Sequence, residues 1–162
     1  MVHLITGPID SGKTTRMRQL YEALGKGDGF LLNKRMANGI HIGQTIERLS
    51  SGKVLNFSSK AGYIPVGWDE CVRYCDYSFS KKGFAFAYSI ISDILNNGIG
   101  PVFIDEIGPL ELSRGGFYDL LRRCLDRETD LYLCVRDTCV DAVREAFEMK
   151  ETEILNIYGK RW

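Results

Sequence analysis

Apolar residues recur along this chain in two different patterns. Short apolar runs, each typical of a strand, lie at residues 2–6, 30–36, 101–106, 130–136 and 153–158. Between these runs, apolar positions three or four residues apart predict helices over residues 14–24, 83–95, 116–126 and 138–149. Because strands and helices alternate in this way, we expect a three-layer α/β sandwich built on a largely parallel sheet.

Residues 39–82 depart from this alternation. Turn signals at Asn38-Gly39 and at residues 50–53 enclose alternating apolar and polar positions, which predicts an antiparallel hairpin over residues 39–58 at one edge of the sheet. Residues 59–82 look irregular and rich in aromatic side chains, a pattern typical of a lid or substrate loop, or of aromatics that cover a sheet edge. We expect residues 1–162 to form one domain.

The first strand leads into a loop that fits the pattern G-x-x-x-x-G-K-[ST]. Its glycines allow successive backbone N–H groups to turn toward a phosphate chain, and the helix that follows directs its positive dipole end at the same anion. Lys13 would bring a charge to the β- and γ-phosphates, and Thr14 would offer its hydroxyl to Mg²⁺. The predicted nucleotide-binding residues are Gly7, Pro8, Ile9, Asp10, Ser11, Gly12, Lys13, Thr14 and Thr15.

The apolar run over residues 101–106 ends in two adjacent carboxylates, Asp105 and Glu106. In an open α/β sheet, ligands collect at the carboxyl ends of the strands, where this pair and the phosphate loop would meet. Asp105 is placed like the acidic residue that helps to hold Mg²⁺ in phosphate-loop enzymes. Glu106 would lie nearer the γ-phosphate and could accept a proton from an attacking water or orient that water. We therefore predict Thr14 and Asp105 as metal ligands, with Glu106 and Lys13 as catalytic residues.

Two resemblances extend this interpretation. A glutamate after the acidic strand resembles the additional-strand, catalytic-glutamate division of phosphate-loop enzymes, which implies five core strands in the order 5-1-4-3-2. More closely, residues 102–112 resemble the signature of the THEP1-type nucleoside-triphosphatases, in which Asp-Glu-Ile-Gly is followed two residues later by Glu-Leu. Segment order agrees over essentially the whole chain. The family resemblance implies Mg²⁺-dependent hydrolysis of nucleoside triphosphates to diphosphates, with broad base tolerance and slow turnover.

The chain departs from the family pattern at two places. Asp10 lies inside a loop that is usually richer in glycine, and because a carboxylate facing phosphate would repel it, we expect Asp10 to point away or to hold water or metal. The family motif Gly-x-Arg-x-Gly-Phe is matched by residues 39–44, where His41 replaces the arginine and Gln44 the phenylalanine. A role of that arginine in phosphate or base contact therefore does not carry over to this chain.

Further cations near the γ-phosphate are expected from the chemistry of phosphoryl transfer. Arg136 ends a strand and would emerge at the ligand edge, and Arg114 lies on the loop after the acidic strand. We rank these two as catalytic candidates ahead of Lys160 and Arg161, while an ordinary surface position stays open for each. Glu111, which the family motif includes, is expected to support the site residues from behind or to anchor a loop.

Composition and charge bear on the partners and the location of the protein. Lys plus Arg and Asp plus Glu number 21 each, so no net charge favours nucleic acid or an anionic membrane surface as a partner. No apolar run approaches the length that crosses a bilayer, and the first residues lack a signal-peptide pattern, so we expect a cytoplasmic protein. The five cysteines are odd in number and scattered, which favours reduced thiols.

The leading expectation is a Mg²⁺-dependent hydrolase of ATP, GTP or other nucleoside triphosphates. One alternative is a small-molecule or nucleotide kinase, with residues 59–82 as the acceptor site and Glu106 as base toward a hydroxyl. The other is a nucleotide-dependent binding module, with His41, Gln44 and the aromatic stretch as a partner surface. A guanine-specific Asn-Lys-x-Asp motif is absent, because Asn33-Lys34 is followed by Arg35-Met36. This absence weakens the interpretation as a GTPase switch.

Overall fold

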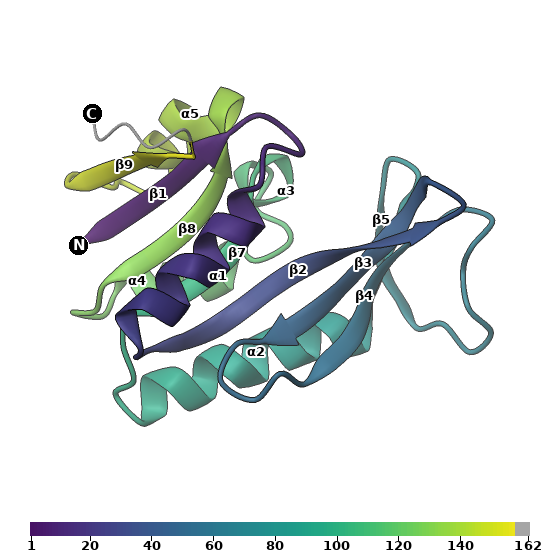
Figure 1. The fold of residues 1–162 in the computed structure, drawn as a ribbon, viewed down its shortest axis with the longest axis horizontal. Coiled ribbons are helices and arrows are strands. Elements are labelled where there is room, and N and C mark those ends of the chain that lie inside the picture. Colours follow the sequence, from purple (N-terminus) through teal and green to yellow (C-terminus); the bar gives the residue numbers. More distant parts are fainter. Residues whose placement is uncertain (158–162) are drawn as a thin grey trace.

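Nine strands form one sheet in the computed structural model, which describes residues 1–157 (Figure 1). The parallel part of this sheet consists of β1 (Val2–Gly7), β2 (Asp28–Ala37), β7 (Val102–Ile107), β8 (Leu131–Arg136) and β9 (Thr152–Asn156). These strands stand in the order β9-β1-β8-β7-β2. Numbered along the chain, that is the predicted order 5-1-4-3-2.

The other side of the sheet is larger than predicted. The expected hairpin is present as β3 (Ile40–Arg48) and β4 (Val54–Lys60), which pair antiparallel. The prediction that residues 59–82 are irregular is wrong for two segments, β5 (Glu70–Tyr74) and β6 (Tyr77–Ser80), which form a second hairpin. β6 also pairs with β4, so β2 is followed by a four-stranded antiparallel extension in the order β3-β4-β6-β5. The sequence does not predict these short strands because β5 is mostly exposed and β6 has only four residues, so neither shows a clear alternation of apolar and polar positions.

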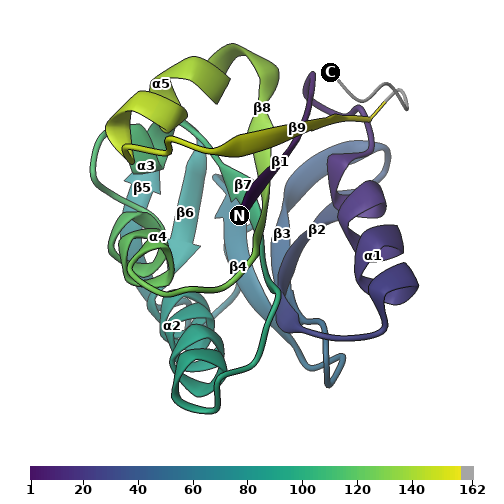
Figure 2. The same ribbon diagram turned by 90° about the vertical axis from the view of Figure 1, so that its left-hand side faces the viewer.

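Helices cover both faces of the sheet, as expected for three layers (Figure 2). α1 (Lys13–Leu24) packs on one face against β1, β2, β7 and β8. The other face carries α2 (Lys81–Asn96), the short α3 (Pro109–Leu112), α4 (Tyr118–Leu125) and α5 (Val140–Ala146), which follows a 3-10 turn over Asp137–Cys139. α2 begins two residues before the predicted start because the Ser80 side chain caps it by accepting a hydrogen bond from the amide of Gly83.

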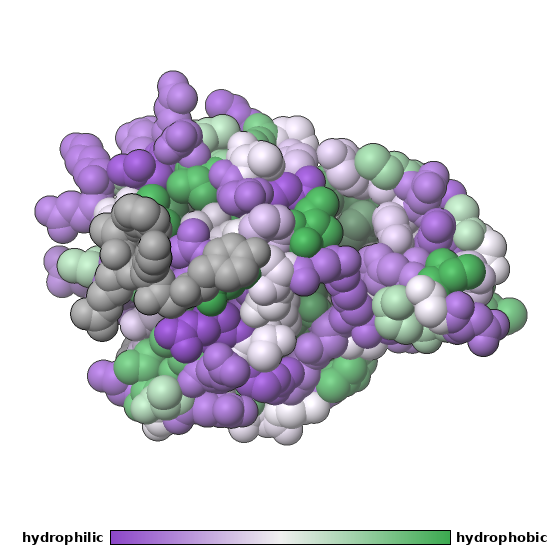
Figure 3. Space-filling model, turned by 45° about the horizontal axis from the view of Figure 1, so that its top comes forward, coloured by the Kyte–Doolittle hydropathy of each residue, from purple (hydrophilic) through white to green (hydrophobic). Residues whose placement is uncertain are grey.

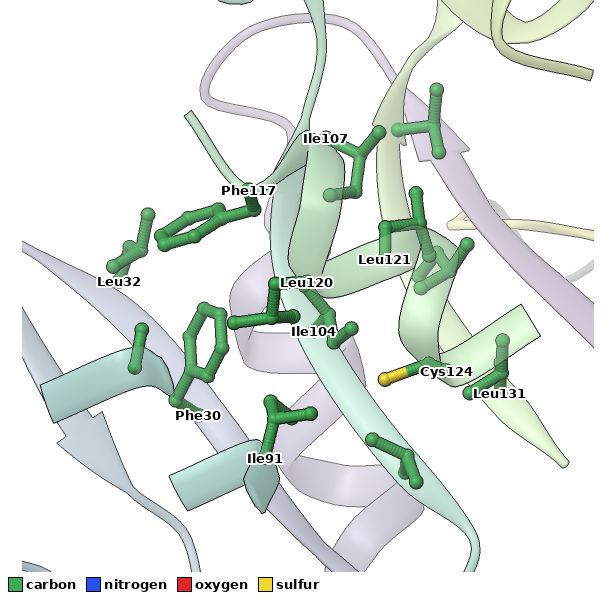
Figure 4. Close-up of a cluster of buried hydrophobic side chains, with 14 of the residues drawn as sticks. Phe30, Leu32, Ile91, Ile104, Ile107, Phe117, Leu120, Leu121, Cys124 and Leu131 are labelled. Atoms are coloured by element: carbon green, nitrogen blue, oxygen red, sulfur yellow. The ribbon is translucent and has the colours of Figure 1, made fainter. Parts of the chain in front are cut away.

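Alternating side chains of the parallel strands fill two separate core layers. Leu31 and Phe103 pack with Met17 under α1. Their chain neighbours Phe30 and Ile104 point to the opposite face, into the larger core beneath α2 and α4 that Figure 4 shows. All five side chains are fully buried, and each such burial contributes about 1.5–3 kcal/mol to the free energy of unfolding. This two-sided burial holds the parallel strands rigidly in place.

Apolar side chains on the face drawn in Figure 3 lie in small patches separated by hydrophilic ones. The longest helix, α2, has 16 residues, and over residues 1–157 the structure contains no helix with the length and hydropathy of a membrane span. Parallel pairing places the carboxyl ends of β1, β7 and β8 at one edge of the sheet, with Gly7 opposite Arg136 in register. The loops that leave this edge carry the predicted site.

Candidate active site

The loop between β1 and α1 has the backbone of an anion-binding turn. The Ser11 amide and hydroxyl both donate to the carbonyl of Pro8, at 3.3 and 2.7 Å. Gly12 then adopts a left-handed conformation with φ of 91° at the N-cap of α1, which a glycine tolerates at little cost. No acidic residue lies in the first turn of α1, where Thr15 is exposed, so the free N–H groups and the helix dipole meet no competing negative charge.

The ammonium group of Lys13 folds back onto this loop. It donates to the carbonyl oxygens of Gly7 at 2.9 Å and of Pro8 at 2.6 Å. Both acceptors are neutral carbonyl oxygens, whereas the oxygens of a phosphate carry negative charge and attract the ammonium by Coulomb interaction as well. Lys13 is therefore placed to exchange these carbonyls for the oxygens of a bound phosphate.

Thr14 and Asp105 meet across the carboxyl edge of the sheet. The Thr14 hydroxyl donates to Oδ2 of Asp105 at 2.8 Å, and the Leu32 amide donates to the same oxygen at 3.0 Å. Asp105 is only 2% exposed, and burial raises its pKa although both hydrogen bonds act to lower it. None of the ion pairs found within residues 1–157 involves Asp105. The carboxyl group thus lies buried with neutral partners alone.

This pair fits one particular type of metal site. Hydroxyl and carboxylate oxygens are the ligands that Mg²⁺ prefers, and in nucleotide sites the ion takes only one or two of them from the protein, the rest coming from phosphates and water. Across the described residues there is no cluster of three or more His, Cys, Asp or Glu side chains that could hold a metal by itself. Thr14 and Asp105 therefore suit a Mg²⁺ ion that arrives with a nucleotide.

Glu106 follows Asp105 and has an unusual backbone conformation, with φ of 65°. The residue is exposed, and Oε2 of its carboxyl group accepts a hydrogen bond from Nε2 of Gln44 on β3. Protein atoms around the carboxyl group nevertheless desolvate it and raise its pKa to about 7, with the negative charge of Asp105 as the second cause. A carboxyl group with such a pKa can accept a proton near neutral pH.

Comparisons with known proteins show the family of this chain. A family model described as NTPase matches residues 3–161 of this chain. The chain belongs to the THEP1-type NTPase family. A crystal structure of THEP1 from the hyperthermophile Aquifex aeolicus matches with a TM-score of 0.72 and 25% identity over 97% of this chain and 90% of that one. A solution structure of a human cancer-related nucleoside triphosphatase matches with a TM-score of 0.65 and 25% identity, over 96% and 87% of the two chains. A comparison with curated protein sequences finds no significant match.

Family membership supports an enzyme that hydrolyses nucleoside triphosphates. Glu111 lies in the segment whose sequence resembles the family signature. Glu111 is 3% exposed, and its two carboxylate oxygens accept hydrogen bonds from the amides of Gly108 and Phe117, both at 2.9 Å. A Cβ atom on Gly116 would come within 2.2 Å of the same carboxylate. Glu111 therefore anchors the loop after β7, as the sequence suggested.

The two residues that depart from the family motif have different surroundings. Gln44 contacts Glu106, as described above. His41, on β3, instead contacts another strand of the extension, because Nδ1 of its ring lies 3.0 Å from the hydroxyl of Tyr77 on β6. Desolvation lowers the pKa of His41, and the charge of Lys34 lowers it further. The motif thus marks Gln44 as a departure, but its contact with Glu106 could not be deduced from the motif.

The side chain of Asp10 contacts Lys34 in the second half of β2. The two side chains form an ion pair, and the hydrogen bond from Lys34 is the largest cause that lowers the pKa of Asp10. Both side chains are largely exposed. The expectation that Asp10 points away agrees with this contact, but Lys34 carries no sequence signal that would have revealed it.

The basic residues predicted to act near the γ-phosphate have different surroundings. Arg136 is partly buried directly opposite Gly7 in the β1–β8 pairing, so its backbone adjoins the phosphate loop. Arg114 is exposed, and its guanidinium carbon lies 6.0 Å from the ring centroid of Tyr118 at the start of α4. Lys160 and Arg161 lie outside the described residues. Of the two described arginines, Arg136 is the one that pairs in register with a residue of the phosphate loop.

Proposed function

We propose that this chain hydrolyses nucleoside triphosphates to diphosphates and inorganic phosphate in a Mg²⁺-dependent reaction with broad base tolerance. The observation that carries the proposal is the contact between Thr14 of the phosphate loop and buried Asp105, which joins two sequence motifs into one oxygen-lined site. Family membership and the two structural matches support hydrolysis as the general reaction.

In this proposal the phosphate loop and Lys13 bind the triphosphate. The backbone N–H groups of residues 9–14, at the loop and the start of α1, donate to the phosphate oxygens, and Lys13 exchanges its two carbonyl partners for phosphate oxygens. Thr14 and Asp105 would hold Mg²⁺. When bound, that ion supplies positive charge that offsets the charge developing on the phosphate oxygens. The buried position of Asp105 keeps competing water away from this contact.

Glu106 serves as the base in this proposal. The oxygen of a water molecule forms a bond to the γ-phosphorus while its proton passes to a carboxylate oxygen of Glu106, and the bond from the γ-phosphorus to the bridging oxygen breaks with its electrons going to the diphosphate. Gln44 occupies Oε2 of Glu106, so Oε1 is the oxygen that takes the proton. Arg136, beside the loop, is the residue we propose for contact with the transferring phosphoryl group.

Phosphate release from purified protein tests the proposal. ATP, GTP, CTP and UTP are each supplied with and without Mg²⁺, alone and with a panel of hydroxyl-bearing small molecules and nucleoside monophosphates. We expect phosphate release from all four nucleotides that requires Mg²⁺ and no acceptor. Transfer of the γ-phosphate to an acceptor, with no release in its absence, would instead show a kinase. Release that appears only when a protein partner is added would show a binding module.

A further inference from the structure

The side chain of Glu106 is hydrogen-bonded by a residue from the antiparallel extension. Gln44 lies on β3, and β2 stands between β3 and β7 in the sheet (Figure 1). The pairing of β2 with β7 stops at Phe30 and Ile104, one residue before Asp105. Beyond that point the two strands no longer share a ladder, and the Gln44 amide donates to Oε2 of Glu106 across the end of β2.

A second hydrogen bond fixes which end of the Gln44 amide faces Glu106. The hydroxyl of Ser58 on β4 donates to Oε1 of Gln44 at 3.3 Å. With its oxygen accepting from Ser58, the amide presents its NH₂ group to the carboxylate. Ser58 is 1% exposed, so its hydroxyl is held by the core of the extension rather than by solvent.

The backbone of β3 is shaped to bring Gln44 into this position. Gln44 and Ser58 are paired in register, and a β-bulge lies between Gln44 and Thr45. The preceding Gly43 has φ of 149°, and a Cβ atom at this position would come within 2.1 Å of the Ser58 carbonyl oxygen. A glycine is therefore needed for β3 and β4 to approach closely where Gln44 leaves the strand.

We propose that Gln44, oriented by Ser58, is a positioning residue that holds the carboxylate of Glu106 in one orientation for proton transfer. An exposed glutamate otherwise samples many rotamers, and the hydrogen bond at Oε2 fixes the side chain while it leaves Oε1 free to accept the proton. This inference rests on the proposed function, since it requires Glu106 to act on the attacking water. It gives the extension an indirect part in the reaction, through its hydrogen bond to Glu106.

A double-mutant cycle tests the inference, with kcat and KM for Mg²⁺-ATP as the readouts. Gln44→Met keeps the length of the side chain and removes the donor. We expect it to lower kcat about tenfold, the order of magnitude for the loss of a hydrogen bond to a charged group, and to leave KM unchanged. Ser58→Ala should lower kcat by a smaller factor, and the double variant should fall no further than Gln44→Met alone, since Ser58 acts through Gln44.

Gln19→Met is the matched control, because Gln19 is an exposed residue in the middle of α1. It should leave both kinetic constants unchanged. In a Glu106→Gln background, measured in single turnover, Gln44→Met should have no further effect. Should Gln44→Met not fold, Gln44→Glu serves as the second variant and is expected to lower kcat at least as much, because it places two carboxylates together.

The outcomes separate the inference from the proposed function. If the unmodified protein hydrolyses ATP and Gln44→Met changes kcat less than twofold, the positioning role is wrong while the hydrolase proposal stands. The same holds if Gln44→Met has an equal effect with and without the Glu106 carboxylate. Absence of hydrolysis by the unmodified protein would overturn both. A kcat loss that disappears in the Glu106→Gln background supports the inference.

Discussion

Two buried aspartates lie at opposite ends of the same pair of parallel strands. Asp28 opens β2 and is paired in register with Val102, the first residue of β7, whereas Asp105 lies near the carboxyl end of β7. Their exposed fractions are 1% and 2%. Residue type and burial are therefore the same, and the difference between the two sites lies in the partners of each carboxylate.

Asp28 is surrounded by donors, one of them charged. Its carboxylate accepts hydrogen bonds from Nε of Arg48 at 2.7 Å and from the amide and hydroxyl of Ser50 at 3.0 and 2.8 Å. Arg48 also forms an ion pair with Asp93 on α2. These contacts join the start of β2, the β3–β4 turn and α2, so Asp28 is a structural residue whose charge is compensated within the protein.

Asp105 has neutral hydrogen-bond donors and forms no ion pair within residues 1–157, and although the charge of Lys13 acts to lower its pKa, burial has the larger effect. A buried carboxylate in this state lowers the stability of the fold, because burial raises its pKa above the unfolded value. We infer from this difference that Asp105, and not Asp28, is the aspartate that would hold Mg²⁺ in the proposed site. We expect the charge to be compensated only when Mg²⁺ binds with the nucleotide.

The largest expected effect is a loss of kcat on substitution of Glu106, the neighbour of Asp105. Glu106→Gln keeps the size of the side chain and removes its ability to accept a proton, so kcat for phosphate release should fall by about 10²–10⁴-fold. Nucleotide affinity, measured by titration of a fluorescent ATP analogue with Mg²⁺, should stay within a few-fold of the unmodified value. Normal binding combined with hydrolysis at the unmodified rate would contradict the role assigned to Glu106.

The free energy of unfolding of two aspartate variants tests whether Asp28 and Asp105 differ as described. Asp28→Asn removes one member of a buried ion pair and should lower the free energy of unfolding in urea by about 3 kcal/mol, the low end of the usual range because Arg48 keeps Asp93.

Asp105→Asn should leave the free energy of unfolding unchanged or raise it at pH 7. The sign follows because a raised folded-state pKa makes the ionised Asp105 unfavourable above its unfolded pKa, and asparagine carries no charge. Equal destabilisation by the two substitutions would show that Asp105 is as structural as Asp28.

A third paired carboxylate extends the comparison to pH. Glu47 on β3 accepts two hydrogen bonds from Arg18 on α1, at 3.0 and 2.7 Å, and one from Asn33 at 2.7 Å. The bond to Arg18 is the largest cause that lowers the pKa of Glu47. Its contribution to stability is therefore present above the unfolded pKa, near 4.5, and is lost as the pH falls through the lower folded-state value.

Arg18 is 37% exposed, so screening by solvent limits this contribution to about 1 kcal/mol. The difference in free energy of unfolding between the unmodified protein and Glu47→Gln should be measurable at pH 7 and should shrink toward pH 3. A difference that grows on acidification would mean that Glu47 is not held as a charged partner of Arg18.

The smallest effect concerns the exposed ion pair at the phosphate loop. Asp10→Asn should change the free energy of unfolding by less than about 1 kcal/mol, because both Asp10 and Lys34 are largely exposed. It also removes a negative charge from the loop and frees Lys34, so Mg²⁺-ATP should bind a few-fold more tightly in a titration at low salt. Weaker binding would instead indicate that Asp10 itself holds water or metal for the nucleotide.

The sequence predicted the parts of the site that local backbone chemistry encodes. The phosphate loop needs Gly12 in a left-handed conformation and a lysine and threonine at the start of a helix, and this spacing is visible without a structure. The order of the parallel strands followed from the glutamate after Asp105 through resemblance to a known division of enzymes. Both signals are continuous in sequence, which is why they could be recognised.

Contacts between distant segments could not be predicted in the same way. Gln44 and Glu106 are 62 residues apart, and Lys34 and Asp10 are 24 apart. Their meeting depends on how far β2 and β7 remain paired and on the bulge in β3, which no local pattern reveals. The structural role of Asp28 was missed for the same reason, since its partners Arg48 and Ser50 come from the far end of a hairpin.

The most direct test of the difference between the two aspartates is the thermal shift produced by Mg²⁺ with a non-hydrolysable ATP analogue. For the unmodified protein, ligand at about 100 times its Kd should raise Tm by roughly 5–10 °C. Asp28→Asn should melt at a lower temperature than the unmodified protein yet keep this shift. Asp105→Asn, without ligand, should melt no lower than the unmodified protein, but it should lose the part of the shift that requires Mg²⁺. A full Mg²⁺-dependent shift in Asp105→Asn, or its loss in Asp28→Asn, would contradict the account.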